Sequence, residues 1–129
     1  MEFPSSKTPR KATTKQVGDI AESEALRYLQ QKGLRLVQRN YRTPGRGGGE
    51  IDLIMTAPDG TTVFVEVRSR AANAHGGAGA SIGVTKQRRI VFAARHYLMR
   101  LRQIPPCRFD VVLVEPEGLQ WIPAAFEAS

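Results

Sequence analysis

The chain has 129 residues, a formal net charge of +7 and a pI near 10.2. This length suits one domain with a single core, and no apolar run approaches the roughly 20 residues that cross a bilayer. The only cysteine, Cys107, excludes an intrachain disulfide and fits a reducing cytosol, so we expect a cytoplasmic protein without membrane attachment. The excess of positive charge favours a polyanionic partner, a nucleic acid above all. A basic surface without a ligand is the alternative.

Residues 1–16 are rich in Ser, Thr, Pro, Lys and Arg, and this composition predicts a disordered basic tail ahead of a domain spanning residues 17–129. A helix is predicted over residues 18–32, because alanines and leucines follow helical spacing and a glycine follows. Glu22 borders the apolar stripe of this helix. The alternative to a functional role is that Glu22 is a surface acid that only stabilises the positive N-terminal end of the helix.

A first strand is predicted over residues 34–41, and the Pro- and Gly-rich residues 43–49 must form a loop that carries Arg46. Three consecutive glycines in this loop would allow the backbone to approach a ligand closely, although a flexible turn is the more common meaning. The pattern of a phosphate-binding P-loop is absent from the sequence.

Two apolar runs with acids in their middles predict a β-hairpin over residues 50–68. Alternation with period two places Glu50 and Asp52 on one face of the first strand, with Ile51 and Leu53 on the other. On the second strand it places three side chains together, Phe64, Glu66 and Arg68. An ionised carboxylate among valines is costly unless it is paired or holds a metal, so a cation is expected between the strands.

A glycine- and alanine-rich loop follows at residues 69–80, and it contains Arg70 and His75, of which His75 is a weak candidate for contacting phosphate. A second helix is predicted over residues 83–102, with an apolar stripe, six Lys or Arg and no acid. One sign of charge on a whole helix favours a phosphate backbone as its partner, with Lys86, Arg88 and Arg89 as contacts and Gln87 as a further candidate. Arg46 and Arg70, on the two loops, are also candidate contacts to nucleic acid.

Strands are also predicted at residues 108–114 and 119–122, which gives the order α-β-β-β-α-β-β. The long helix between two strands predicts a right-handed crossover with a parallel pair, whereas the hairpin is antiparallel. The fold class is therefore α/β, a single domain with a mixed sheet flanked by helices. Few aromatic side chains are expected at the surface, which disfavours the reading of single strands by base stacking.

Two carboxylates with a backbone carbonyl and waters would make a hard oxygen site suited to Mg²⁺ or Mn²⁺. Such a metal polarises a phosphoryl oxygen and activates a bound water, which is nuclease chemistry. The residues themselves leave open an equally weighted alternative, in which Asp52 and Glu66 only form salt bridges with the abundant arginines.

Asp52, thirteen intervening residues and Glu66-Val67-Arg68 resemble the D…(D/E)-x-K pattern of restriction-endonuclease-like nucleases. A longer set of motifs resembles the YraN family of small bacterial proteins, whose fold is related to that of Holliday-junction resolvases. That set covers residues 17–126 and consists of Gly18-Asp19-x-x-Glu22-x-x-Ala25, Gly49-Glu50-Ile51-Asp52-Leu53-Ile54, Val63-Phe64-Val65-Glu66-Val67-Arg68, Lys86 and Arg108-Phe109-Asp110-Val111-Val112.

The resemblance implies a restriction-endonuclease-like core in which Asp52 and Glu66 bind the metal and Glu22 completes the catalytic site, directly or through water. Glu50 would support this site or pair with an arginine. Arg68 stands where the pattern prefers lysine, and an arginine stays protonated, so it would stabilise charge on phosphate rather than act as a base.

The resulting expectation is a metal-dependent endonuclease that hydrolyses DNA, including branched or structured DNA, with Mg²⁺ or Mn²⁺ as cofactor. The alternatives are a nuclease fold that binds nucleic acid without cutting it, which Arg68 favours, and a scaffold whose acids and arginines are structural. A homodimer would suit a two-fold substrate.

Overall fold

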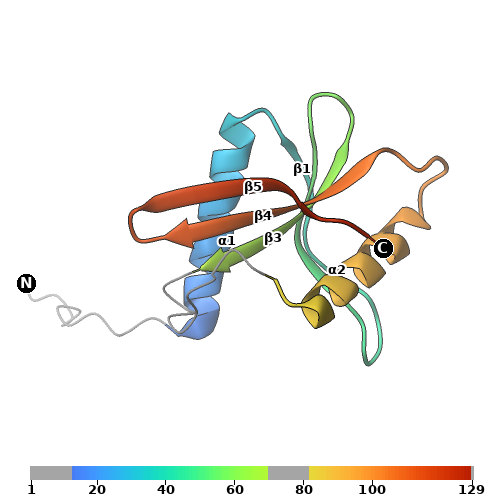
Figure 1. Ribbon diagram of the computed structural model, residues 1–129, viewed down its shortest axis with the longest axis horizontal. Coiled ribbons are helices and arrows are strands. Elements are labelled where there is room, and N and C mark those ends of the chain that lie inside the picture. Colours follow the sequence, from blue (N-terminus) through green and yellow to red (C-terminus); the bar gives the residue numbers. More distant parts are fainter. Residues whose placement is uncertain (1–12, 70–81, 129) are drawn as a thin grey trace, which may run out of the picture.

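Two helices enclose a five-stranded sheet in the computed structural model, which describes residues 13–69 and 82–128 (Figure 1). The elements, in chain order, are α1 (Thr14–Gln31), β1 (Arg35–Arg42), β2 (Glu50–Thr56), β3 (Thr62–Ser69), α2 (Val84–Leu98), β4 (Cys107–Glu115) and β5 (Gly118–Phe126). The predicted order and the single α/β domain are confirmed. Neither of the helices within the described ranges is both long and apolar enough to cross a membrane.

The strands lie in the sheet in their order along the chain, β1-β2-β3-β4-β5. Three neighbouring pairs are antiparallel, and only β3 and β4 are parallel, joined through α2. A parallel pair needs a long crossover, whereas a hairpin turn is sufficient for an antiparallel one. The predicted mixed sheet, with its hairpin at β2–β3 and its helical crossover, is therefore confirmed.

Each helix covers its own apolar cluster on one face of the sheet. Ala21, Ala25 and Leu29 of α1 pack against a cluster that includes Val63 and Val65 of β3. On the other face, the α2 cluster joins helix residues to sheet side chains, among them Ile90, Phe64 and Phe109. The faces of β3 alternate as predicted.

The first helix begins earlier than residue 18, because Thr13 caps it. The Thr13 hydroxyl accepts a hydrogen bond from the Gln16 backbone N–H, and the Gln16 side chain accepts one from the Thr13 N–H. This reciprocal capping box satisfies two backbone donors that would otherwise lack partners. Residues 13–16 therefore belong to the helix end and not to the predicted tail, whereas residues 1–12 lie outside the described part.

Two other boundaries differ from prediction. The second helix ends at Leu98 rather than near residue 102. The last strand extends to Phe126, well beyond the predicted end at residue 122, because most of its length pairs with β4. Local signals such as proline mark where a helix must have ended, but pairing partners decide where a strand stops.

The alternation predicted for β2 is wrong at Asp52. Ile51 belongs to the α2 cluster and Leu53 to the α1 cluster, although the two residues were expected on one face. The paired register of β2 with β3 ends at Leu53 and Val65, so the strands separate beyond this point. Regular pleating is enforced by ladder pairing, and once the ladder ends the chain is free to turn a side chain sideways.

Candidate active site

Asp52 lies where β2 separates from β3. Its side chain, rather than the backbone, forms the next hydrogen bond between the two strands. The Val67 N–H donates a 2.8 Å hydrogen bond to Asp52 Oδ2, across the gap where strand pairing has ended. The carboxyl group of Glu66 nevertheless forms a hydrogen bond with the carboxylate of Asp52. Glu66 is only 6% exposed. The predicted meeting of these two acids is therefore present in the fold.

The pKa values of Asp52 and Glu66 are both raised, so the environment of the pair disfavours two negative charges. Burial and the negative charge of Asp52 raise the pKa of Glu66 to about 8, against the partial relief that Lys86 provides. Burial also raises the pKa of Asp52, although the hydrogen bond from Val67 opposes the shift. Two buried carboxylates this close favour holding a shared proton at neutral pH unless a cation neutralises them.

Lys86 approaches the pair from the first turn of α2. Its Nζ lies 3.6 Å from Glu66 Oε2, and Arg68 acts on the same carboxylate as a weaker cationic neighbour. The first turn of α2 contains no acid, and its cap residue Gly83 provides no side-chain hydrogen bond. A helix start with a lysine and no acid is unfavourable for the helix itself, so this end of α2 presents positive charge to the acids.

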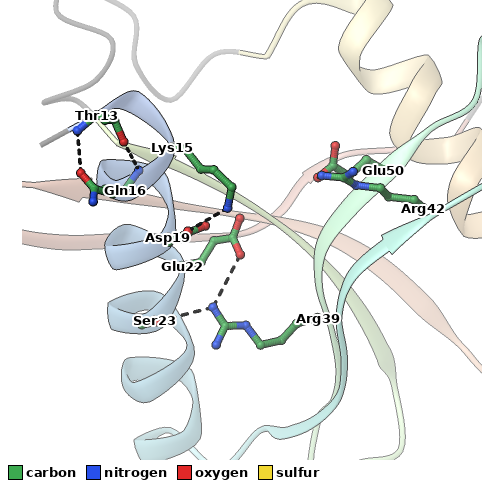
Figure 2. Close-up of polar contacts among 9 residues, drawn as sticks. All are labelled: Thr13, Lys15, Gln16, Asp19, Glu22, Ser23, Arg39, Arg42 and Glu50. Atoms are coloured by element: carbon green, nitrogen blue, oxygen red, sulfur yellow. Dashed lines mark hydrogen bonds and ion pairs between the residues drawn. The ribbon is translucent and has the colours of Figure 1, made fainter.

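Glu22 extends from α1 toward Arg39 of β1 (Figure 2). Its Oε1 lies 3.7 Å from an Nη of Arg39, which reaches it from β1. That distance is too long for a hydrogen bond, and Glu22 Oε1 and Arg39 Nε are buried without a hydrogen-bond partner. Burial and the charge of Asp52 raise the pKa of Glu22 to about 7. Glu22 is thus coupled to the pair, and one of its buried oxygens is unsatisfied.

The fit of these residues to a divalent cation is partial. Carboxylate oxygens are the donors that Mg²⁺ and Mn²⁺ prefer, and the pair and the unsatisfied Glu22 oxygen provide them. Within residues 13–69 and 82–128, however, no three His, Cys, Asp or Glu side chains converge closely enough to hold one ion. Direct ligation by all three predicted acids is therefore not formed, because Glu22 sits on a separate helix. Asp52 and Glu66 are the two acids that meet, and Glu22 interacts with Asp52 through its charge.

Glu50 has the predicted arginine as its partner. Arg42 Nη2 lies 3.6 Å from Glu50 Oε2, in a pair that stands apart from Glu22 in Figure 2. The Arg42 and Glu50 side chains line two hollows, one of about 390 Å³ beside Lys86 and Arg89 and one of about 430 Å³ beside Glu22. Glu50 therefore joins the two sides of the candidate site.

The glycine-rich loop is shaped by contact with its own chain. A Cβ on Gly49 would lie 1.9 Å from the Arg89 carbonyl oxygen, and one on Gly48 would lie 2.1 Å from Thr43 Oγ1. The Gly49 N–H also donates a 2.7 Å hydrogen bond to Thr43 Oγ1. The glycines were expected to let the backbone approach a ligand, but at Gly49 the backbone lies against α2 instead. This contact holds Arg89 at the wall of the hollow.

The other residues that were predicted to contact nucleic acid lie in different parts of the molecule. Arg89 lines the hollow with Lys86, and Arg46 is exposed on the loop beside it. Arg88 lines a different groove of α2. The Gln87 side chain donates to the Ile82 carbonyl at 2.8 Å, which gives it a structural partner. Arg70 and His75 lie outside the described residues.

Two arginines of the site were not among the predicted site residues. Arg39 pairs with Glu22, and Arg42 lines both hollows. The signal was present in the sequence, because the arginines around β1 have no acid among them. A partner from a distant element cannot be read from that local run.

Comparison with known proteins identifies the family. The sequence model of the uncharacterised protein family UPF0102 matches residues 21–114. The chain belongs to this family. A UPF0102 protein of Albidiferax ferrireducens is 73% identical over 128 residues, which cover 99% of each chain. UPF0102 proteins of Polaromonas naphthalenivorans and Paracidovorax citrulli are 62% and 67% identical, covering 94% and 92% of this chain and 85% and 88% of their own.

The UPF0102 assignment confirms the resemblance to the YraN family, which is the same family. The matched segment contains all three candidate acids, together with Arg68 and Lys86. Membership places the candidate site residues within the segment that defines the family.

Proposed function

We propose that this UPF0102 protein is a metal-dependent endonuclease that hydrolyses phosphodiester bonds of DNA, with branched or structured DNA as the substrate class. The observation that carries the proposal is the pair of Asp52 and Glu66, which meets where β2 separates from β3 and is buried beside the cationic Lys86 and Arg68. An acid pair inside a protein of net charge +7 is an arrangement suited to bringing a cation and a phosphate together.

Asp52 and Glu66 would hold Mg²⁺ or Mn²⁺, with Glu22 orienting a water at the edge of the site. When bound, such an ion polarises a phosphoryl oxygen and lowers the pKa of a coordinated water. The hydrogen bond from Val67 N–H fixes one Asp52 oxygen, Oδ2. Orientation of both carboxylates by the strand backbone is the contribution that this fold makes.

Lys86 and Arg68 supply the fixed positive charge of the site. Lys86 Nζ lies beside Glu66 although it comes from a helix, so it places an amine near the position where the nuclease pattern has a strand lysine. Arg68 remains protonated and would stabilise the negative charge that develops on the phosphate. In this arrangement Lys86 and Arg68 together would replace the single strand lysine of the nuclease pattern.

Further basic residues would hold the nucleic-acid backbone on either side. Arg89 and Arg42 line the hollow next to Lys86, and Arg46 stands exposed on the adjoining loop. Contacts of this kind are sequence-independent, and they weaken as the salt concentration rises because the release of condensed counterions then gains less free energy. A four-way junction or a flap presents several backbones to such a surface at once.

The test is a cleavage assay on labelled four-way junction, duplex, single-stranded DNA and RNA, with Mg²⁺, Mn²⁺ or chelator. We expect metal-dependent cutting that falls on the order of a thousandfold in Asp52→Asn and in Glu66→Gln, since each loses a ligand that contributes several kcal/mol. Glu117→Gln, an exposed acid in the β4–β5 turn, is the matched control and keeps full activity. Cutting that survives both site substitutions would refute the proposal.

A binding module that does not cut is the second candidate, and Arg68 is the observation that favours it. Without a strand lysine, the site has one group fewer that can change its protonation state near neutral pH. This candidate predicts salt-sensitive binding to DNA and no cleavage with either metal. Arg68→Lys then decides between the two, because gain of cleavage in that variant would show that the arginine had silenced a working site.

A further inference from the structure

The outer side of α2 carries a second feature that the acid pair does not use. A groove of about 400 Å³ lies there, and Glu127 lines part of it. Figure 1 shows that the C-terminal end of the chain lies next to α2. Phe92 lines this groove and is 52% exposed. Its neighbours in the groove include two cations and two aliphatic side chains, Arg88, Arg95, Val84 and Val91. The sequence had led us to expect few exposed aromatics, and Phe92 is one of them.

Helical spacing joins this groove to the candidate active site. Phe92 lies four residues after Arg88 and three before Arg95, so all three side chains are neighbours on the helix surface. Phe92 also lies three residues after Arg89, which lines the hollow beside Lys86. One strand of nucleic acid could therefore run along α2 from Lys86, which lies beside Glu66, past Arg89 to the groove.

The chemistry of the groove selects among occupants. A second copy of this chain would bring its own net charge of +7 against Arg88 and Arg95, which is repulsive. A nucleotide instead offers a phosphate to a guanidinium and a flat ring to Phe92, and bases stack on aromatic side chains whatever their sequence. The carboxylate of Glu127 repels phosphate but accepts hydrogen bonds from the amino group of a base.

We propose that Phe92, with Arg88 and Arg95, forms a stacking site for an unpaired base of the nucleic acid. The proposal rests on the proposed nucleic-acid function and makes it more specific: the favoured substrate has a single-stranded segment, such as a flap, next to the bond at the acid pair. Continuous duplex offers no unpaired base and would use the arginines alone.

The experiment measures binding in chelator, so that cleavage plays no part. Flap and single-stranded oligonucleotides carrying 2-aminopurine, whose fluorescence falls on stacking, are titrated with wild-type protein, Phe92→Ala and Phe92→Trp. We expect Phe92→Ala to weaken single-strand and flap binding by about 5- to 100-fold and to abolish the quenching, because stacking on an aromatic contributes that much per base. Phe92→Trp retains both, and duplex affinity changes less than about twofold in either variant.

Met99→Ala is the control, because Met99 is also apolar and exposed, and it does not line the groove. Unchanged single-strand binding and quenching in Phe92→Ala overturn the proposal. So does a shift from dimer to monomer in sedimentation caused by Phe92→Ala alone, since the groove would then be covered by a second copy. Loss of binding in Phe92→Ala together with absence of cleavage on every substrate supports the stacking site and refutes the nuclease.

Discussion

Two acidic centres lie on neighbouring strands of the same sheet and are treated in opposite ways. Asp110 of β4 is completely buried and is fully hydrogen-bonded. Arg108 Nε donates to both of its oxygens at 3.0 and 3.2 Å, and Trp121 Nε1 and the Ala124 N–H donate at 2.9 Å each. Four hydrogen bonds, two of them from the cationic Arg108, offset the cost of removing this carboxylate from water.

The pair of Asp52 and Glu66 has no comparable set of donors, although Val65, which pairs with Asp110, is adjacent to Glu66 in the chain. One backbone N–H reaches Asp52, and Lys86 stands at 3.6 Å from Glu66, beyond hydrogen-bond range. A buried acid that is satisfied holds the fold together, whereas a buried acid that is not satisfied is available for a cation. Asp110 is thus a saturated acid, and the Asp52–Glu66 pair, for which we propose a functional role, has far fewer donors.

The largest effect in this comparison is expected from Asp110→Asn. The variant leaves Arg108 without its buried partner and replaces an acceptor of four hydrogen bonds with an amide that can donate, so the free energy of unfolding should fall by about 3 to 5 kcal/mol. Urea denaturation followed by tryptophan fluorescence measures it. Asp19→Asn, which breaks an exposed pair with Lys15, is the control and should change stability by less than about 1 kcal/mol. Equal midpoints for Asp110→Asn and wild type would assign Asp110 no structural role.

Glu66→Gln should act in the opposite direction. The pKa of Glu66 is about 8 in the folded protein, above its ordinary value of 4.5, so the folded state holds this proton more tightly than the unfolded chain does. The stabilising contribution of the proton is complete below pH 4.5 and is lost as the pH rises toward 8. A glutamine keeps a neutral side chain at every pH.

We therefore expect Glu66→Gln, in chelator, to match the wild type near pH 4 and to exceed its free energy of unfolding by about 2 to 4 kcal/mol near pH 9. Urea midpoints measured across that range provide the check, with Glu117→Gln as the exposed acid for reference. A variant less stable than wild type at high pH would mean that the pair is held ionised by its cationic neighbours.

The third and smallest effect concerns Mg²⁺. Because the pKa values of Glu66 and Glu22 are raised to about 8 and about 7, these groups hold protons near pH 6.5, and cation binding should release about one of them. Titration calorimetry in buffers of different ionisation enthalpy counts the proton. Glu22→Gln should weaken Mg²⁺ binding about tenfold, as loss of an outer group does, whereas Asp52→Asn should abolish it. Binding that is unchanged in Glu22→Gln would remove Glu22 from the site.

Much of the fold could be predicted from local patterns. Period-two runs located the strands, apolar stripes located both helices, and the helix between two strands indicated the parallel pair. The predicted pairing of Glu66 with Asp52 required only that two acids occupy facing strands. Boundaries were less accurate, because the cap at Thr13 involves a side chain three residues away and the end of β5 depends on its pairing with β4.

The sequence alone determined which residues are available: two acids in apolar strands, a helix with only basic charges, and an arginine where the pattern has lysine. Only the tertiary structure decided how they are used. The ladder of β2 and β3 ends at Leu53, Lys86 reaches Glu66 from a helix, and Gly49 lets α2 lie against the loop. The tertiary structure also supplied hydrogen-bond donors to Asp110, and it buried Asp52 and Glu66 together so that the pKa of Glu66 is raised. The physical reason is that side-chain periodicity is local, whereas hydrogen-bond saturation depends on donors brought from distant parts of the chain.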